Sequence, residues 1–308
     1  MNEISSLKLP IEIKACSDVS LSAGKLVLSM SGLKSEVKKD AYVESHHAVV
    51  TKADEQSQSE IMKALNNQFS KAYFIVEEKC KDKELVAKVL NETNFKKFLK
   101  NVFLIDALDG TSQKARDSYI WSVSVGHMSD GQLQGGSIFC PAILNGLQVF
   151  GTKDKSYFRE NVNLDNTQIQ DAKVSQTQDL KQSRVYIGAD LLQNKAFTNF
   201  LLNMANRTRT HSVANSCAVA LSEIACGKAD AIVQTIQSPW DFAAGIPLVQ
   251  GAGGLVQFYH VEKSGICLID KLGAEDFDPA RRTVGFVAGN NKKIVTELTD
   301  QLVDEYKP

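Results

Sequence analysis

The segment Asp106–Thr111 concentrates the side chains of this sequence that are best suited to chemistry. It reads Asp-Ala-Leu-Asp-Gly-Thr and follows an apolar run, Val102–Ile105, that has the composition of a buried strand. Such a strand would deliver two carboxylates at its carboxyl end, where α/β sheets usually place their ligands. Gly110 permits a tight turn, and Thr111 can cap the next segment, leaving N–H groups that suit an anion. Two acids, a glycine and a hydroxyl on one turn indicate a site for a hard divalent cation and a phosphate.

Two further acids could join this turn. Glu77 follows an apolar strand pattern at residues 72–76, and Asp241 stands at the start of a predicted helix, just after Pro239. Taken singly, Asp241 could simply complement a helix dipole, an effect of about 0.3–1 kcal/mol, and Glu77 could be an ordinary loop charge. The prediction of a metal site therefore depends on four acids together: Glu77, Asp106, Asp109 and Asp241.

Two motifs carry a family resemblance. Asp106–Thr111 matches the pattern D-P-x-D-G-T except at Ala107, where the pattern has proline. Trp240–Gly245 matches W-D-x-A-A-G, and an A-G-G follows at residues 252–254. In this order the sequence resembles the inositol monophosphatase family of magnesium-dependent, lithium-sensitive phosphatases.

Two upstream motifs extend the resemblance. Residues 50–54 match the family's V-T-x-x-D, and residues 76–78 match its G-E-E less well, with Val76 in place of glycine. The resemblance thus covers roughly residues 49–256. Any one of these motifs would be weak, whereas four in family order are strong.

The resemblance implies a magnesium site. Glu77, Asp106 and the main-chain carbonyl of Leu108 would hold a first Mg²⁺. Asp106 would bridge to a second ion, which Asp109 and Asp241 would also hold. We expect two or three Mg²⁺ ions, because hard cations prefer oxygen ligands. Ions about 3.5–4 Å apart can lower the pKa of a water and stabilise the leaving oxygen.

The same resemblance implies which residues bind the phosphate and which orient the attacking water. The N–H groups of Gly110 and Thr111 would hold phosphate oxygens. Thr111, paired with Asp54, would help to orient the water, and Glu77 would complete the catalytic residues. Phosphoryl transfer needs mainly positioning and charge neutralisation, which this set supplies without a protein nucleophile.

The residues that would contact the leaving group depart from the family. Asn215-Ser216-Cys217 aligns with the family's sugar-binding G-S-A, and Gln234 aligns with its substrate-contacting glutamate. A carboxylate that accepts hydrogen bonds from vicinal hydroxyls is here a neutral amide, which argues against strict myo-inositol specificity. The expected substrate-binding residues are Gly110, Thr111, Asn215, Ser216, Cys217 and Gln234.

Three functions follow as hypotheses. The first is a Mg²⁺-dependent phosphomonoesterase that hydrolyses a small polyol or sugar phosphate with a metal-activated water. The second is a 3′(2′),5′-bisphosphate nucleotidase of the same superfamily, since Lys114 or Arg116 could face a second anionic group, although both could be exposed helix charges. The third is a non-catalytic binding or assembly protein that retains the fold, suggested by the departures at Val76, Ala107 and Gln234.

Other chemistries fit the spacing less well. Aspartyl-nucleophile phosphatases place two aspartates one residue apart in D-x-D-x-T, whereas two residues separate Asp106 from Asp109. An EF-hand needs alternating oxygen ligands, which this turn does not continue. The glycine-rich residues 251–254 lack the third glycine of a dinucleotide loop and follow a predicted helix. His46-His47 has no accompanying cluster and is typical of a solvated loop.

The whole chain indicates an ordinary globular protein. It has 308 residues and a formal net charge of -1, with scattered Lys and Arg, which gives no support for a nucleic-acid polymer or a membrane surface as partner. No apolar run approaches the roughly 20 residues needed to cross a bilayer, and a cytoplasmic location is expected. The six cysteines contain no C-x-x-C pair and are expected to be free thiols. The resemblance further implies lithium inhibition and a homodimer.

The fold class follows from two kinds of element pattern. An antiparallel meander is expected at residues 119–151, with Asp130-Gly131 and Asn145-Gly146 as its turns. A polar connection at residues 161–182 leads to alternating strands and helices. These features predict α+β and α/β halves, at residues 1–170 and 171–308, which share one site. The family resemblance implies a layered α/β/α/β/α sandwich of the inositol monophosphatase and fructose-1,6-bisphosphatase type.

The individual elements are predicted from hydrophobic periodicity. Helices are expected at residues 10–33, 61–69, 81–100 (as an exposed insertion), 191–205, 214–226, 240–250 (with a kink at Pro247) and 294–303. Strands are expected at residues 72–76, 102–105, 119–128, 133–143, 146–151, 184–189, 231–235, 255–258 and 284–288.

Overall fold

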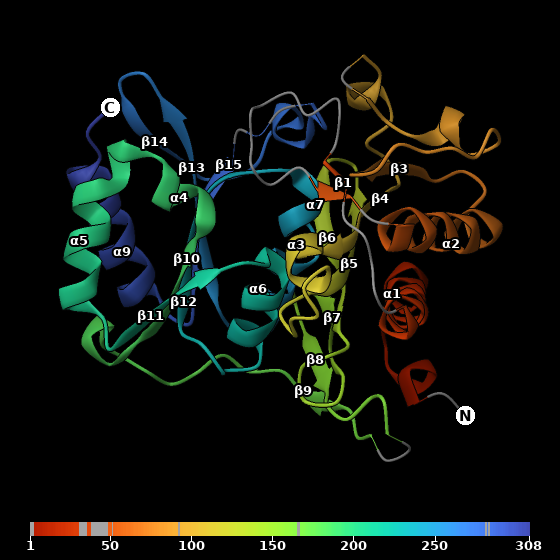
Figure 1. Ribbon diagram of the computed structural model, residues 1–308, viewed down its shortest axis with the longest axis horizontal. Helices are drawn as coiled ribbons and strands as arrows, with labels where there is room; N and C mark the ends of the chain where they lie inside the picture. The colour runs from red at the N-terminus through yellow and green to blue at the C-terminus, as the bar shows by residue number, and fades with distance from the viewer. Residues whose placement is uncertain are drawn as a thin grey trace.

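The computed structural model describes residues 3–30, 36–37, 49–50, 52–91, 93–164, 167–280, 282 and 284–308. Two sheets alternate with three layers of helices, which confirms the predicted α/β/α/β/α sandwich (Figure 1). His46-His47, Thr51 and the predicted end of the first helix at residues 31–33 lie outside the described residues.

The first sheet has seven strands in the order β3-β4-β5-β6-β7-β8-β9. β3 and β4 are parallel, and each later pair is antiparallel, which confirms the predicted meander. Two outer helices, α1 (Ile11–Ser29) and α2 (Lys52–Gln68), pack on one face of this sheet. The strands are β3 (Tyr73–Val76), β4 (Val102–Asp109), β5 (Ser122–Ser129), β6 (Gln132–Cys140), β7 (Leu147–Thr152), β8 (Ser156–Arg159) and β9 (Gln170–Asp171). A separate pair, β1 (Glu36–Val37) and β2 (Val49–Val50), forms a small antiparallel sheet.

The second sheet has six strands in the order β11-β10-β12-β15-β13-β14. β11 and β14 were not predicted, because neither has a strong apolar pattern and both lie at sheet edges. The outer face is covered by α4 (Ala189–Gln193), α5 (Thr198–Arg207) and α9 (Lys292–Glu305). The strands are β10 (Arg184–Gly188), β11 (Thr210–Ala214), β12 (Ala231–Gln237), β13 (Leu255–Glu262), β14 (Gly265–Ile269) and β15 (Val284–Gly289).

The middle layer joins the two sheets into one core. α6 (Cys217–Ala225) and α7 (Pro239–Phe242) lie between the sheets in Figure 1, beside the short α3 (Thr111–Lys114). α8 (Gly245–Gly251) contacts strands of both sheets. One hydrophobic cluster contains Leu104 of β4, Leu221 of α6 and Phe286 of β15. The division proposed at residues 170 and 171 falls inside β9. No helix in the described part of the chain combines the length and apolarity needed to cross a bilayer.

Two predicted helices in the first half are corrected. α1 ends at Ser29, because Met30 is extended. Residues 81–100 form only two 3₁₀ turns, η2 (Val86–Lys88) and η3 (Phe95–Lys97). The segment is not a wholly exposed insertion, since its apolar side chains Leu85, Leu90 and Phe95 are buried. These buried side chains are five residues apart, a spacing that does not place them on one face of a helix.

Three predicted helices in the second half are shorter than expected. The helix at residues 191–205 is interrupted at Asn194, whose side chain accepts a hydrogen bond from the Ala196 N–H and so begins a new turn. The helix predicted from Ala214 begins only at Cys217, because Ser216 is its N-cap. Residues 240–250 form two helices, α7 and α8. The break precedes Pro247, which sits in the first turn of α8, where proline needs no N–H partner.

Candidate active site

The four predicted acids line one cavity of about 400 Å³. We call Glu77, Asp106, Asp109 and Asp241 the carboxylate cluster, and the space that they line the carboxylate cavity. β3 and β4 are parallel, and Val76 pairs with Ile105, so the next residues, Glu77 and Asp106, leave the same sheet edge side by side. The expectation that residues far apart in sequence meet at the carboxyl ends of these strands is therefore met by the backbone register.

An irregularity in β4 brings both of its aspartates to the cavity. Side chains three residues apart on a regular strand point to opposite faces of the sheet. The pairing of β4 with β5 shifts register between Asp106 and Asp109, and this bulge lets both side chains line the cavity. The Leu108 N–H donates to Asp106 Oδ1 at 3.1 Å, which stabilises the turn. Gly110 has φ +93°, and a Cβ there would lie 2.7 Å from the Ile120 carbonyl oxygen, so glycine is required.

Asp241 is both a helix cap and a cavity residue. It lies in the first turn of α7, and its Oδ2 accepts a hydrogen bond from the Ser238 N–H at 3.0 Å. The dipole interpretation of Asp241 is thus compatible with its place in the cluster. Arg282, which also lines the cavity, donates from Nε to Ser238 Oγ at 3.1 Å. Capping therefore orients the carboxylate, and Arg282 adds a nearby positive charge.

Asp109 is held by the start of α6. Its Oδ2 accepts hydrogen bonds from Ser216 Oγ and from the Ala218 N–H, both at 2.7 Å. Ser216 was predicted to contact substrate, but its hydroxyl is committed to Asp109 and it does not line the carboxylate cavity. In this structure Ser216 positions a predicted metal ligand, and its contact with substrate stays a prediction.

Burial and mutual repulsion dominate the electrostatics of the cluster. Burial, and next the charges of the other three cluster members, raise the pKa of Asp106 well above its usual value. Burial raises the pKa of Asp109 to about 6, although its hydrogen bonds from Ser216 and Ala218 oppose the shift. Burial likewise raises the pKa of Asp241 to about 8, against the opposing charge of Arg282. Such a cluster needs either protons or added cations.

The oxygen ligands of the cluster suit a hard cation, but the four carboxylate groups do not lie close together. Carboxylate oxygens are the ligands that Mg²⁺ prefers. Among the residues that the structure describes, no three His, Cys, Asp or Glu side chains are already grouped closely enough to hold an ion. The assignment of metal ligands therefore stays a prediction that the shared cavity supports.

Thr111 and Asp54 meet as predicted. Thr111 Oγ1 lies 2.9 Å from Asp54 Oδ1 and 3.0 Å from the Leu108 carbonyl oxygen. Asp54 is 1% exposed and comes from the first turn of α2, on the opposite side of β4 from the middle helices. Thr111 and Gly110 both line the cavity, so the predicted phosphate end and the carboxylates share one space.

The remaining predicted substrate residues all lie at the carboxylate cavity. Asn215, Cys217 and Gln234 line the cavity beside the carboxylate cluster. Asp190, Gln237 and Arg282 also line it and were not predicted. Asp190 and Gln237 follow strand patterns, as the predicted acids do, but no family motif singles them out.

Of the two cations proposed to contact a second anionic group, only Arg116 lines the carboxylate cavity. Lys114 is buried, its Nζ donates to the Met30 carbonyl oxygen at 3.0 Å, and it lies over the Trp121 ring at 5.5 Å. Lys114 therefore points away from the cavity and is not a substrate contact. Arg116 does line the cavity, with Nη1 donating to the Ser112 carbonyl oxygen at 3.1 Å.

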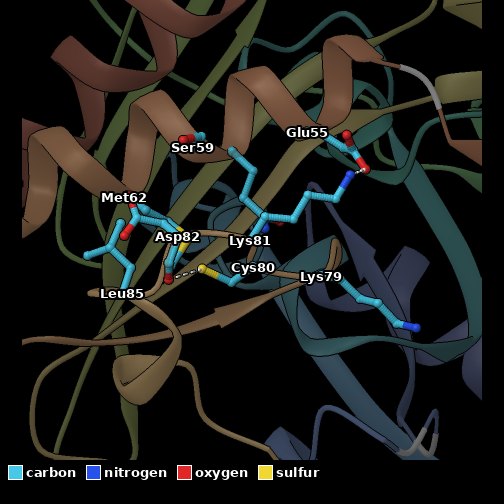
Figure 2. Close-up of a pocket in the computed structure, with 9 residues that line it drawn as sticks. Glu55, Ser59, Met62, Lys79, Cys80, Lys81, Asp82 and Leu85 are labelled. Atoms are coloured by element: carbon cyan, nitrogen blue, oxygen red, sulfur yellow. Dashed lines mark hydrogen bonds and ion pairs between the residues drawn. The ribbon is translucent and has the colours of Figure 1, made fainter.

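A separate hollow of about 50 Å³ lies between α2 and the segment that follows β3 (Figure 2). It contains the Cys80 thiol, whose pKa burial raises, with Sγ 3.7 Å from the Asp82 carbonyl oxygen. None of its lining residues belongs to the carboxylate cavity. A thiol whose pKa is raised is a poor nucleophile, so this hollow does not compete as the candidate active site.

Comparison with known proteins identifies relatives over nearly the whole length. The sequence model of the inositol monophosphatase family matches residues 12–305. An inositol-1-monophosphatase of Synechocystis is 25% identical over 299 residues, covering 94% of this chain and 88% of that protein. A fructose-1,6-bisphosphatase/inositol-1-monophosphatase of Thermotoga maritima is 26% identical over 156 residues, covering 50% of this chain and 56% of that protein.

Solved structures share the fold. The extragenic suppressor protein suhB of Bartonella henselae has a TM-score of 0.68 at 21% identity and covers 95% of this chain and 98% of its own. The inositol monophosphatase of Anabaena has a TM-score of 0.65 at 21% identity and covers 97% of both chains. At these identities the structures establish the layered fold alone.

Proposed function

Since this chain belongs to the inositol monophosphatase family and is a phosphoric monoester hydrolase, we propose that it hydrolyses a small polyol or sugar phosphate in a Mg²⁺-dependent reaction. The observation that carries the proposal is the carboxylate cluster, in which the residue after β3, two residues of β4 and one of α7 line one cavity. From the family resemblance we also propose a cytoplasmic location, a homodimer and inhibition by lithium.

The cluster and the Leu108 carbonyl would hold two or three Mg²⁺ ions. Bound Mg²⁺ would neutralise the phosphate, activate a water as the nucleophile and stabilise the leaving oxygen. Because the carboxylates are not tightly grouped in the described residues, we expect ion binding to draw them closer together. The raised pKa values of Asp106, Asp109 and Asp241 support this assignment, since added positive charge relieves the repulsion within the cluster.

The chain's own contribution to the reaction is positioning. The N–H groups of Gly110 and Thr111 would hold the phosphate at the start of α3. The Thr111 hydroxyl donates a hydrogen bond to Asp54 or to the Leu108 carbonyl, so its oxygen can accept a hydrogen bond from the attacking water. This acceptance would direct a lone pair of the water toward phosphorus.

Replacing Thr111 tests the water-orienting pair. We expect Thr111→Ala to lower kcat by about a hundredfold, because the water loses its acceptor, with KM changed less than about threefold. Thr111→Ser keeps the hydroxyl and should retain kcat within about fivefold. Steady-state kinetics at saturating Mg²⁺ measure both variants. Equal losses in the two variants, or no loss in alanine, would contradict the role given to the hydroxyl.

The proposed function is tested by phosphate release from a panel of esters. Inositol 1-phosphate, fructose 1,6-bisphosphate, adenosine 3′,5′-bisphosphate and 4-nitrophenyl phosphate form a sufficient panel. We expect turnover of at least one polyol or sugar phosphate, and chelation of Mg²⁺ should reduce it by at least about a hundredfold. No Mg²⁺-dependent turnover of any ester would instead favour the non-catalytic alternative.

Arg116 and Arg282 support the bisphosphate nucleotidase alternative, which the same panel of esters tests. Both line the carboxylate cavity, and guanidinium groups bind a second phosphate well. A kcat/KM for adenosine 3′,5′-bisphosphate above that for inositol 1-phosphate would favour the bisphosphate nucleotidase. Lys114 no longer supports this alternative, because its ammonium group is bound to Met30.

A further inference from the structure

A second bulge turns two glutamines into the carboxylate cavity. The pairing of β12 with β15 shifts register between Gln234 and Gln237. Ile236, between them, has φ +51°, a left-handed conformation that a β-branched residue rarely adopts. Three residues apart on a regular strand, the two glutamines would point to opposite faces, yet both line the cavity. Strain of this kind persists where the surrounding structure requires it, often at a functional site.

The side-chain oxygen of Gln234 is buried without a partner. Gln234 is 4% exposed, and its Oε1 accepts no hydrogen bond within the part of the chain that the structure describes. Gly188 makes room for it: a Cβ at residue 188 would lie 1.6 Å from Gln234 Oε1. Buried amides are almost always hydrogen-bonded. A buried amide oxygen that lines a cavity and lacks a protein partner indicates a ligand contact.

Asp190 adds a carboxylate to this wall of the cavity. It lies in the first turn of α4, two residues after Gly188, and lines the same cavity as Gln234. Its Oδ2 accepts a hydrogen bond from Gln237 Nε2 at 3.3 Å, and among the described residues this is its only one. Gln237 Nε2 also donates to the Thr235 carbonyl oxygen at 2.9 Å, so the bulged backbone fixes the group that orients Asp190.

We propose that Asp190, Gln234 and Gln237 form the subsite for the leaving alcohol, with Asp190 as its specificity-determining residue. Hydroxyl groups would donate to the free oxygen of Asp190 and to Gln234 Oε1. Asp190 thereby supplies the acidic acceptor that residue 234, as an amide, does not. The same charge disfavours a second anionic group at this wall, so the subsite selects neutral, hydroxyl-bearing leaving groups. This inference rests on the proposed function.

The experiment compares Asp190→Asn with wild type on two substrates. Asparagine keeps the shape and removes the charge, so kcat/KM for inositol 1-phosphate should fall about ten- to hundredfold, mainly through KM. For 4-nitrophenyl phosphate, which has no hydroxyls on its leaving group, the fall should be at least about tenfold smaller. Gly188→Ala, whose Cβ would displace the Gln234 amide, should lower kcat/KM for inositol 1-phosphate more than kcat/KM for 4-nitrophenyl phosphate. Asp300→Asn, an exposed aspartate on α9, is the matched control.

A binding measurement separates this subsite from the proposed function. Calorimetric titration of inositol 1-phosphate should show at least about tenfold weaker binding to Asp190→Asn than to wild type, whether or not the ester is hydrolysed. If wild type hydrolyses no ester but shows this difference, the proposed function fails and the subsite stands. Equal losses on both substrates, or unchanged binding, would overturn the subsite while leaving phosphatase activity intact.

Discussion

Replacing Asp106 with asparagine should lower kcat/KM for Mg²⁺-dependent phosphate release by at least about a thousandfold. Asp106 is 2% exposed, and the charges of all the other members of the carboxylate cluster act on it. We therefore propose that Asp106 would be a principal ligand of the Mg²⁺ ions. Asparagine can still accept the Leu108 N–H hydrogen bond, but it does not supply the negative charge. The loss should appear in turnover and in Mg²⁺ affinity, while the fold is preserved.

Phosphate release measured over a range of Mg²⁺ concentrations checks this expectation. Asp300→Asn makes the same chemical change on the exposed face of α9 and should keep wild-type kinetics. Circular dichroism should show both variants folded. Turnover by Asp106→Asn within about tenfold of wild type would refute the central place given to this carboxylate.

Replacing Asp241 with asparagine should stabilise the metal-free protein while it removes activity. Burial raises the pKa of Asp241 to about 8, which means that the ionised side chain is unfavourable in the folded state. Asparagine removes this charge and can still accept the Ser238 N–H hydrogen bond that caps α7. We expect the melting temperature at pH 8.5 without metal to rise by about 3 °C or more. Mg²⁺ should then add less stability to the variant than to wild type.

The stability of the metal-free protein should fall as pH rises. The folded pKa of Asp241, about 8, lies above its ordinary value of 3.8. Between these values the folded state binds more protons than the unfolded state, so the stability of the metal-free protein falls as pH rises. The advantage of asparagine should therefore be small near pH 5 and grow toward pH 8.5. Asp109, with its pKa raised to about 6, contributes in the same direction over a lower range.

Thermal unfolding followed by circular dichroism, with chelator and with Mg²⁺, measures both effects. Asp300→Asn is again the control, since an exposed aspartate should give little change in melting temperature. A variant at Asp241 that is less stable than metal-free wild type at pH 8.5 would show that this carboxylate stabilises the fold and is not held there for an ion.

Local sequence was sufficient for the elements whose apolar pattern is continuous. The run Val102–Ile105 predicted a buried strand, and β4 begins at Val102. Asp130-Gly131 and Asn145-Gly146 predicted hairpin turns, and both join strands of the meander. Local sequence failed where tertiary burial competes with helical spacing, as at Leu85, Leu90 and Phe95. There the favourable transfer of apolar side chains to the core outweighs the helical propensity of the charged residues between them.

Lys114 illustrates a limit of reasoning from residue type. A lysine three residues after Thr111 is a reasonable candidate for a substrate phosphate. In the fold its ammonium group lies over Trp121 and is bound to the Met30 carbonyl at the end of α1. That partner is 84 residues away in the chain. Only the packing of α1 against the central turn determines where this cation points.

The sequence by itself determined which side chains could hold metal, phosphate and water, because motif order and residue type are local properties. The tertiary structure decided which of them meet. Asp106 and Asp109 are three residues apart, and so are Gln234 and Gln237. On a regular strand, side chains three residues apart point to opposite faces. In each pair a bulge turns both side chains to one cavity, and each bulge is set by the pairing of its strand with a neighbour distant in sequence. Register between strands is a non-local property, so this convergence could not be derived from the sequence of either segment alone.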